Sequence, residues 1–490
     1  MLFCELLQFE RVIWAKGGAF VPVTGLSLNS RTVGHGALFF CLRGAHHDGH
    51  DYAMDAYRRG CRHFVVERML PLPPDASVLV CSSVRKKMAV LSSRYYREPT
   101  KGLFLVGVTG TKGKTTTSLM LRELLERCGI PTAYIGSSGV VFGRNRIATE
   151  NTTPPSPDIY KYLRMILDSG IKTVVLEVSS QALAADRVFG ALFSLGVFTN
   201  ISRDHIGAYE HADMAEYRAA KMKLFTDFSP RQIVLNAEDP FSFDIMERWS
   251  GEECVLYGNG EGSLLKYRKI RQWRKEGRLW TSFYLDGVQG QHEIDLGFAG
   301  EHYILDFLAA LTSASLISGL PYTDMLSYAP MLSVAGRCEA YAMPSGALTV
   351  IDYAHNGASL SAALRGLRPY ATKRLLCLFG AVGERTKCRR TDMAVAAERY
   401  ADFSVITADN PGREDVCTIT QEIMAGFADR ERCCCIPDRE EAIRYLLSLA
   451  GEGDVVLLAG KGDENYQLFA EGKGPFCEGK IIESCGGIRK

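Results

Sequence analysis

The sequence has no excess of charge of either sign. Its 490 residues contain 57 Lys and Arg against 56 Asp and Glu, a formal net charge of +1. Proteins that bind nucleic acids or anionic membranes usually carry a clear basic surplus. The balance argues against nucleic acid as a partner, so any anionic ligand must be held by a local site.

Long apolar runs are also missing. The longest, such as LFLVGV and DVVLLAG, have the length of strands and fall far short of the roughly 20 residues that span a bilayer. The first residues mix acids and bases where a signal peptide needs a basic start and an apolar core. We expect no membrane insertion and a cytoplasmic location, and we take a monomer as the working hypothesis.

Cysteine patterns typical of metal sites or disulfide frameworks are absent. The chain has 15 Cys, an odd number, with no CxxC pair, and the run Cys433-Cys434-Cys435 lacks metal-ligand spacing. Free thiols in a reducing cytosol are expected. The sequence also has no internal repeat and no low-complexity tract.

What is present is a regular alternation of short β-type runs and helical patterns, in a chain that is 47% hydrophobic. This alternation predicts an α/β fold with mainly parallel sheets. A chain of this length predicts two to four domains. Polar breaks at 95–102 and 330–336 divide it into predicted domains at 1–99, 100–331 and 332–490.

A glycine-rich turn follows the first strand of the predicted central domain. Residues 103–117 read LFLVGVTGTKGKTTT and lead into a helix that stops at Gly129. Glycines there let backbone N–H groups close on phosphate oxygens, and the helix N-terminus adds positive charge. Lys114 would reach the β- and γ-phosphates, and Thr115 would hold Mg²⁺. Val108 stands where the usual pattern has Gly, so a purely structural turn is the alternative.

Further candidates follow later strands of the same domain. Glu177 ends the strand TVVLEV, where a carboxylate could coordinate Mg²⁺, or could be an ordinary strand-end acid. His205 follows the strand LGVFTN and is either a ligand or a surface histidine. Lys221 and Lys223 lie on a helix expected to begin near Asp213, and the pattern alone predicts solvated lysines.

Ten motifs in order make the chain resemble the Mur ligases of peptidoglycan synthesis. They are LNSR with GAHHDGHDY, VTGTKGKTTT, ENTTPP, LEVSSQAL with DR, FTNISRDH with EYRAAK, AGRCE, VIDYAHN, FGAVGERTK, DNPGRED and AGKGDENYQL. Within the family they most resemble the branch that adds a diamino acid to UDP-N-acetylmuramoyl-L-alanyl-D-glutamate. The resemblance implies an N-terminal UDP-binding domain, a central P-loop ATPase-like domain and a C-terminal Rossmann-like domain that binds the amino acid.

The resemblance also implies a role for individual residues. The ATP-binding residues would be Gly110, Thr111, Lys112, Gly113, Lys114, Thr115, Thr116, Arg337, Asp352 and His355. The UDP-muramoyl-dipeptide would contact Ser30, Arg31, Asp48, Thr152, Thr153, Ser179 and Arg187. The incoming amino acid would contact Arg385, Asp409, Asn410, Gly460 and Glu464. The catalytic residues would be Lys114, Glu177, His205 and Lys221. Mg²⁺ would be held by Thr115, Glu177, His205 and a carbamate formed on Lys221 with CO₂.

Several positions depart from the family pattern, among them DHIG in place of DHLD. Lys112 stands where Asn is usual, and Gln181 and Asp463 each replace a His. Tyr303 and Asp306 stand where two Asn usually help to bind ATP, which bears on nucleotide affinity but not on the class of reaction.

The implied reaction is amide formation driven by ATP. The γ-phosphoryl group would pass to the D-glutamyl γ-carboxylate, and the amine would attack the resulting acyl phosphate. Two other classes are considered: a P-loop ATPase or kinase without a ligase step, and a catalytically silent binding protein. Within the ligases, the alternative is a related enzyme acting on folate or another Mur substrate.

The amine is predicted to be L-lysine rather than meso-diaminopimelate. Family members that take diaminopimelate carry DNPR, whose Arg can pair with the distal carboxylate of that substrate. Here Gly412 stands at the Arg position. An ammonium end would instead favour nearby acids, namely Asp409, Asp415, Asp463 and Glu464. Arg413, one position along, could reverse the preference, and ornithine is also open.

Overall fold

The computed structural model describes residues 1–7, 21–44, 47–204, 206–207, 210–384 and 387–490. It divides into two compact units, of which the first contains residues 1–118 and 129–255 and the second residues 119–128 and 256–490. No helix among the described residues is both long and apolar enough to cross a membrane. The cysteines recorded in these ranges are free thiols.

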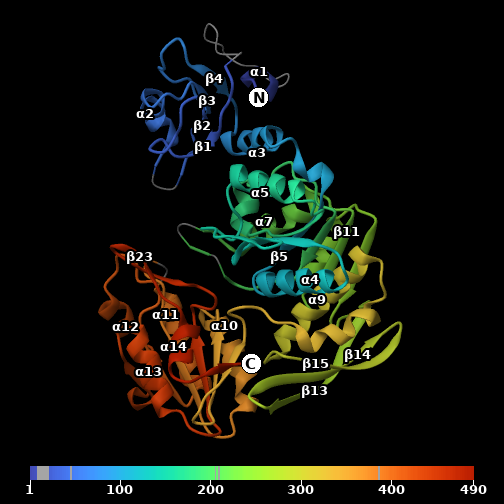
Figure 1. Cartoon of the computed structure of the whole chain (residues 1–490), viewed down its shortest axis with the longest axis vertical. Helices are drawn as coiled ribbons and strands as arrows, with labels where there is room; N and C mark the ends of the chain where they lie inside the picture. Colours follow the sequence, from blue (N-terminus) through green and yellow to red (C-terminus); the bar gives the residue numbers. More distant parts are fainter. Residues whose placement is uncertain (8–20, 45–46, 205, 208–209, 385–386) are drawn as a thin grey trace. The chain divides into compact units, whose positions relative to one another are not determined.

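The N-terminal part of the first unit is built on a four-stranded parallel sheet (Figure 1). Its strands, in spatial as well as chain order, are β1 (Leu26–Ser27), β2 (Leu38–Phe40), β3 (His63–Val66) and β4 (Ser77–Val80). The accompanying helices are α1 (Phe3–Leu7), η2 (Gly49–Tyr52), α2 (Ala53–Arg58), α3 (Val84–Tyr95) and η3 (Pro99–Gly102). Apolar residues of α1 and α3 cover one face and those of α2 the other, which explains why every residue of β2 and β3 is buried.

The rest of the first unit surrounds a larger sheet in the order β11-β10-β5-β9-β6-β7-β8. Its strands are β5 (Phe104–Thr109), β6 (Thr132–Gly136), β7 (Gly139–Phe142), β8 (Asn145–Ile147), β9 (Thr173–Glu177), β10 (Leu195–Phe198) and β11 (Gln232–Asn236). Its helices are α5 (Ser156–Asp168), α6 (Ser180–Ala184), α7 (Met214–Thr226), α8 (Phe241–Arg248) and the start of α4 (Lys114–Arg127), whose residues from Leu119 onward belong to the second unit. Because β9, β5 and β10 are parallel neighbours, the loops that follow them meet at one edge.

The second unit begins within β12 (Glu253–Tyr257) and continues as an antiparallel ribbon. The ribbon consists of β13 (Leu265–Lys275), β14 (Arg278–Gly287) and β15 (Gly290–Leu296), and is followed by α9 (Glu301–Ser318) and η4 (Tyr322–Met331). The sequence reasoning missed this ribbon. Its first turn has Glu276 and Gly277 both at positive φ (53° and 76°), so the Glu-Gly pair between alternating strands was the available signal.

The C-terminal part is a seven-stranded sheet in the order β20-β19-β18-β21-β17-β16-β24. Its strands are β16 (Glu339–Ala342), β17 (Leu348–Asp352), β18 (Leu375–Phe379), β19 (Phe403–Ile406), β20 (Cys433–Cys435), β21 (Val455–Ala459) and β24 (Ile488–Arg489), and a separate hairpin pairs β22 (Tyr466–Phe469) with β23 (Gly472–Pro475). The helices are α10 (Gly357–Leu367), η5 (Arg368–Tyr370), α11 (Cys388–Tyr400), α12 (Val416–Met424), η6 (Arg430–Arg432), α13 (Arg439–Leu449) and α14 (Glu478–Ser484). The five strands from β20 to β17 are parallel, so the loops after β17, β18, β19 and β21 share one edge.

The structure confirms the predicted α/β class with mainly parallel sheets. The helix expected near Asp213 is α7, and the Asp213 side chain caps it by accepting from the Glu216 amide. The boundaries proposed at 99/100 and 331/332 remain a prediction.

Candidate functional site

The glycine-rich turn after β5 has the backbone geometry of a phosphate-binding loop. Gly110 has φ of 153°, and a Cβ there would lie 1.9 Å from the Thr199 hydroxyl oxygen. Gly113 has φ of 83°, and α4 begins one residue later. A side chain at either position would be strained or would clash, so the loop requires both glycines.

Two lysines converge on one carbonyl of this loop. Lys114 Nζ donates to the Gly110 oxygen at 2.9 Å and to the Thr111 oxygen at 3.0 Å, and Lys221 Nζ donates to the same Gly110 oxygen at 2.7 Å. Lys221 is only 1% exposed, so the prediction of a solvated helix lysine was wrong for it. The prediction from helical periodicity was wrong because Lys221 lies on the buried side of α7. Burial first, and then Lys114, lower the pKa of Lys221 well below its ordinary value.

Lys112 uses its extra charge within the site. Its Nζ lies 2.9 Å from a carboxylate oxygen of Asp204, and its backbone N–H donates to Asn200 Oδ1 at 3.0 Å. The neighbouring Thr111 hydroxyl is 3.0 Å from the Tyr217 hydroxyl, and Thr116 is buried. The departure from Asn thus adds an ion pair between the loop and the segment after β10.

Glu177, at the end of β9, is fully buried beside the loop. One carboxylate oxygen accepts from the Thr115 hydroxyl at 3.1 Å, and the other accepts from the Ser137 amide at 3.2 Å and from the Tyr134 hydroxyl. A Cβ on Gly136 would lie 2.3 Å from that second oxygen. The sequence reasoning missed Tyr134 and Ser137, because hydroxyl residues near an apolar strand give no local signal.

A buried carboxylate next to a threonine hydroxyl is a donor set that fits a hard divalent cation. Within the described ranges, no three His, Cys, Asp or Glu side chains group as a ready-made metal site. His205 lies outside the described residues.

The residues expected to contact the muramoyl-dipeptide lie close to Glu177. The Thr153 hydroxyl donates to the Glu177 carbonyl at 2.8 Å and accepts from the Ser179 amide at 3.0 Å. Arg187 donates to the Thr153 carbonyl at 2.6 Å, and the Thr152 hydroxyl is 2.9 Å from that of Ser137. Burial, followed by repulsion from Arg85, lowers the pKa of Arg187.

The residues expected to bind the uridine nucleotide follow neighbouring strands of the N-terminal sheet. Ser30 and Arg31 lie in the turn after β1, where the Arg31 amide donates to Asn29 Oδ1. Asp48 caps η2, accepting from the His50 amide, and also binds Arg68 at 3.0 Å. Burial tends to raise the pKa of Asp48, but the hydrogen bonds from His50 and then Arg68 outweigh it and hold this pKa below its usual range.

In the second unit, the residues expected on the nucleotide side gather around Asp352. Its carboxylate accepts from the Tyr303 hydroxyl at 2.7 Å and from the Cys338 amide at 3.0 Å. The Arg337 guanidinium lies 4.2 Å from the centre of the Tyr353 ring, and His355 Nδ1 is 2.8 Å from the Tyr353 carbonyl oxygen. Tyr303, one of the departures from the family pattern, therefore orients the Asp352 carboxylate.

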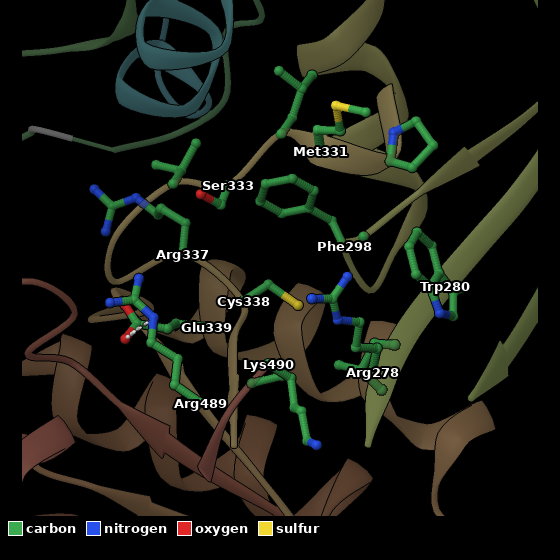
Figure 2. Close-up of a pocket in the computed structure, with 16 residues that line it drawn as sticks. Arg278, Trp280, Phe298, Met331, Ser333, Arg337, Cys338, Glu339, Arg489 and Lys490 are labelled. Carbon is green, nitrogen blue, oxygen red and sulfur yellow. Dashed lines mark ion pairs between the residues drawn. The ribbon is translucent and has the colours of Figure 1, made fainter. Parts of the chain in front are cut away.

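A cavity of about 460 Å³ lies near Arg337 in the same unit (Figure 2). Arg278, Trp280 and Lys490 contribute to its lining, and Arg489 pairs with Glu339 at 3.2 Å. Figure 2 shows the Arg337 guanidinium pointing away from Arg278 and Lys490. Arg337 thus lines this cavity while its guanidinium lies over the Tyr353 ring.

The residues expected to contact the amino acid form a buried network at the edge where β19 and β21 end. Asn410 Nδ2 donates to Glu464 at 2.9 Å, and Lys461 Nζ donates to the same Glu464 oxygen at 2.7 Å. A Cβ on Gly460, which has φ of 117°, would lie 2.7 Å from the Asp409 carboxylate. Burial raises the pKa of Asp409. Arg385 lies outside the described residues, and the sequence reasoning did not single out Lys461.

Comparison with known proteins shows which family the chain belongs to. Models of the Mur ligase family catalytic domain, the Mur ligase middle domain and the Mur ligase glutamate ligase domain match residues 22–96, 108–314 and 336–462 respectively. The chain belongs to the Mur ligase family. Like other Mur ligases it is an ATP-dependent amide ligase, rather than a P-loop ATPase without a ligase step or a silent binding protein.

Individual relatives of this Mur ligase are similar over nearly their whole length. A protein of Geobacillus kaustophilus is 37% identical over 477 residues, covering 96% of each chain, and one of Geobacillus thermodenitrificans is 36% identical over 94% of each. A solved structure is 27% identical with a TM-score of 0.69, covering 99% of this chain and 98% of its own. All three are named UDP-N-acetylmuramoyl-L-alanyl-D-glutamate–2,6-diaminopimelate ligase. These names favour the diaminopimelate alternative over the lysine predicted from Gly412.

Proposed function

We propose that this Mur ligase joins meso-diaminopimelate to UDP-N-acetylmuramoyl-L-alanyl-D-glutamate, at the expense of ATP, in the synthesis of peptidoglycan precursors. The similarity over about 96% of the chain to a relative named for this reaction carries the proposal. The lysine interpretation rested on the missing side chain at Gly412. The adjacent Arg413 is exposed, and Gly412 turns the chain with φ of 61°. On this proposal Arg413 pairs with the distal carboxylate of diaminopimelate.

The first chemical step is phosphoryl transfer to the D-glutamyl γ-carboxylate. Lys114 and the backbone N–H groups of the glycine loop neutralise and position the phosphate oxygens. Thr115, Glu177, His205 and a Lys221 carbamate would hold Mg²⁺, which when bound supplies positive charge to the phosphates. The amine then attacks the acyl carbon, the amide bond forms, and inorganic phosphate leaves with one oxygen of the former carboxylate.

Carbamylation of Lys221 is supported by its surroundings. Its neutral amine would add to CO₂ and release one proton, which gives an N-carboxylate. Only the neutral amine reacts, and burial together with Lys114 favours that form. The new carboxylate would lie beside Lys114 and form an attractive pair with its ammonium.

The proposed substrate positions are those that the resemblance to the Mur ligases implies. Ser30, Arg31 and Asp48 would bind the uridine nucleotide, and Thr152, Thr153, Ser179 and Arg187 the muramoyl-dipeptide. Arg337, Asp352 and His355 would line the nucleotide. Arg385, Asp409, Asn410, Gly460 and Glu464 would receive the amino acid.

The test is a competition assay. The purified protein is given ATP, Mg²⁺ and the UDP-muramoyl-dipeptide, with L-lysine, L-ornithine and meso-diaminopimelate at equal concentration, and the products are identified by mass spectrometry. The proposal expects mainly the diaminopimelate product, and ADP release only when dipeptide and amine are both present. Mainly lysine product would restore the interpretation based on Gly412, and ADP release without amine would contradict a coupled ligase.

A further inference from the structure

Lys461 is a fully buried cation next to the proposed amino-acid residues. It is 0% exposed, and its ammonium lies 2.7 Å from Glu464 Oε2, 2.9 Å from Asn410 Oδ1 and 3.9 Å from Asp409. A buried ammonium is costly unless it is paired and hydrogen-bonded. These contacts satisfy it and connect the loop after β19 with the loop after β21.

The contacts determine which way the Asn410 amide faces. Asn410 Oδ1 accepts from Lys461 Nζ and from the Leu468 backbone N–H, both at 2.9 Å. Both groups can only donate, so the oxygen must face them and Nδ2 must face Glu464. Without Lys461, one of the two constraints on this amide is lost.

Lys461 also determines which part of the Glu464 carboxylate is available. Oε2 is committed to Lys461 and Asn410, whereas Oε1 has only a long contact, 3.4 Å, with the Tyr353 hydroxyl. The Glu464 side chain is 18% exposed. Oε1 is thus the oxygen left in position to accept from an ammonium group of a substrate.

The local charge balance points the same way. Three acids, Asp409, Glu464 and Glu478, stand against two cations, Lys461 and Arg439, and Arg439 is paired with Glu478 at 2.8 Å. The side chains of Asp409 and Glu478 are 2% and 1% exposed, so of these three acids Glu464 is the accessible one. A substrate ammonium would balance it.

We propose that Lys461 is a positioning residue for the incoming amine: it holds Asn410 and Glu464 in the orientation in which Glu464 Oε1 receives a substrate ammonium. This inference rests on the proposed function, because it assigns the amine to this network. A purely structural ion pair is the competing explanation, and the two differ in what substitution does to the individual KM values.

The experiment compares steady-state kinetics of Lys461→Met with the wild type. Met keeps most of the volume of Lys and removes the charge and the donors. We expect KM for the amine to rise by about tenfold to a hundredfold, as for loss of charged hydrogen bonds. KM for ATP and for the UDP-dipeptide should stay within about twofold, since the lost contacts lie at the amine pocket. The matched control is Lys101→Met, which removes an exposed pair of the same spacing, Lys101 with Glu98 at 2.8 Å.

A double variant keeps the proposal testable if Lys461→Met alone folds poorly. Lys461→Met/Glu464→Gln removes one charge of each sign, and its KM for the amine should equal that of Glu464→Gln within about threefold, because Lys461 acts through Glu464. Multiplied effects in the double variant would overturn the inference, as would a lowered melting temperature with unchanged KM for the amine.

The amine preference of the wild type tests the proposed function, and the Lys461 variants test this inference. Each variant is assayed with whichever amine the wild type uses. Wild-type use of lysine overturns the diaminopimelate proposal, while the Lys461 comparison still decides the inference.

Discussion

Lysines have different partners in the two units, in the glycine loop of the first and in the network around Lys461 in the second. Lys114 and Lys221 donate to a neutral backbone carbonyl, that of Gly110. Lys461 is instead surrounded by carboxylate and amide oxygens from Asn410 and Glu464. Exchanging a carbonyl for a phosphate oxygen is favourable for a cation, whereas a lysine already held by a carboxylate is better suited to orient its neighbours.

A buried lysine therefore does not by itself identify the charge of the ligand that binds near it. Its partners do so: a cation held by a carbonyl suits an anionic ligand, and a cation among surplus acids suits a cationic one. Substitutions in the glycine loop and in the network around Lys461 test the two cases separately.

The largest effect is expected at the phosphate loop. Lys114→Ala and Glu177→Ala should each lower turnover by about 10²–10³-fold or more, because each removes a preorganised charge contact in phosphoryl transfer. Binding of the UDP moiety, measured by calorimetry with UDP, should persist, since Ser30, Arg31 and Asp48 follow strands of the separate N-terminal sheet. Near wild-type ligation by either variant would mean that the loop is only structural.

Lys221→Ala tests the second lysine of the glycine-loop site. It should remove most activity, and added small carboxylates should restore part of it by replacing the carbamate. Lys223→Ala, two residues along α7 with only a 3.5 Å contact to the Leu183 carbonyl, is the control and should stay active. A fully active Lys221→Ala enzyme would exclude the carbamate, as would mass spectrometry under native conditions without the added mass of CO₂ in the active protein.

Gly460→Ala tests the network around Lys461 in the second unit. The new methyl group would lie 2.7 Å from the Asp409 carboxylate at a φ of 117°, so Asp409 or the backbone must shift. We expect a rise in KM for the amine of about tenfold, with KM for ATP little changed. Gly472→Ala, where φ is also positive but no atom lies within 4 Å, controls for backbone strain alone. Equal effects of the two substitutions would contradict a role for Gly460 in the pocket.

An effect no larger than that of Gly460→Ala is expected from Tyr134→Phe, which removes one hydrogen bond to the Glu177 carboxylate. The Mg²⁺ concentration for half-maximal activity should rise by about tenfold, as for other partners that orient a metal ligand. Tyr160→Phe, which loses a hydroxyl contact to the Phe189 carbonyl instead, is the control. An unchanged Mg²⁺ dependence of Tyr134→Phe would mean that Glu177 needs no such support.

Local patterns predicted the fold class and the phosphate loop, because a strand, a glycine turn and a helix follow each other directly in the chain. Patterns could not predict features that depend on distant partners. Lys221 on α7 is buried against the Gly110 carbonyl of the loop after β5, and Lys461 matters because Asn410 lies beside it. The β13–β14 turn was missed although Glu276-Gly277 signalled it. The amine was predicted from Gly412 and the acids near it in sequence, whereas the names of the relatives favour diaminopimelate.

The central claim, a ligase that activates a carboxylate as an acyl phosphate, can be measured directly with ¹⁸O. UDP-muramoyl-dipeptide labelled in the D-glutamyl γ-carboxylate is ligated in unlabelled water, and the inorganic phosphate is analysed by mass spectrometry. The account predicts one ¹⁸O in the phosphate for each amide formed, because phosphate leaves with a former carboxylate oxygen. Amide formation with unlabelled phosphate would contradict it.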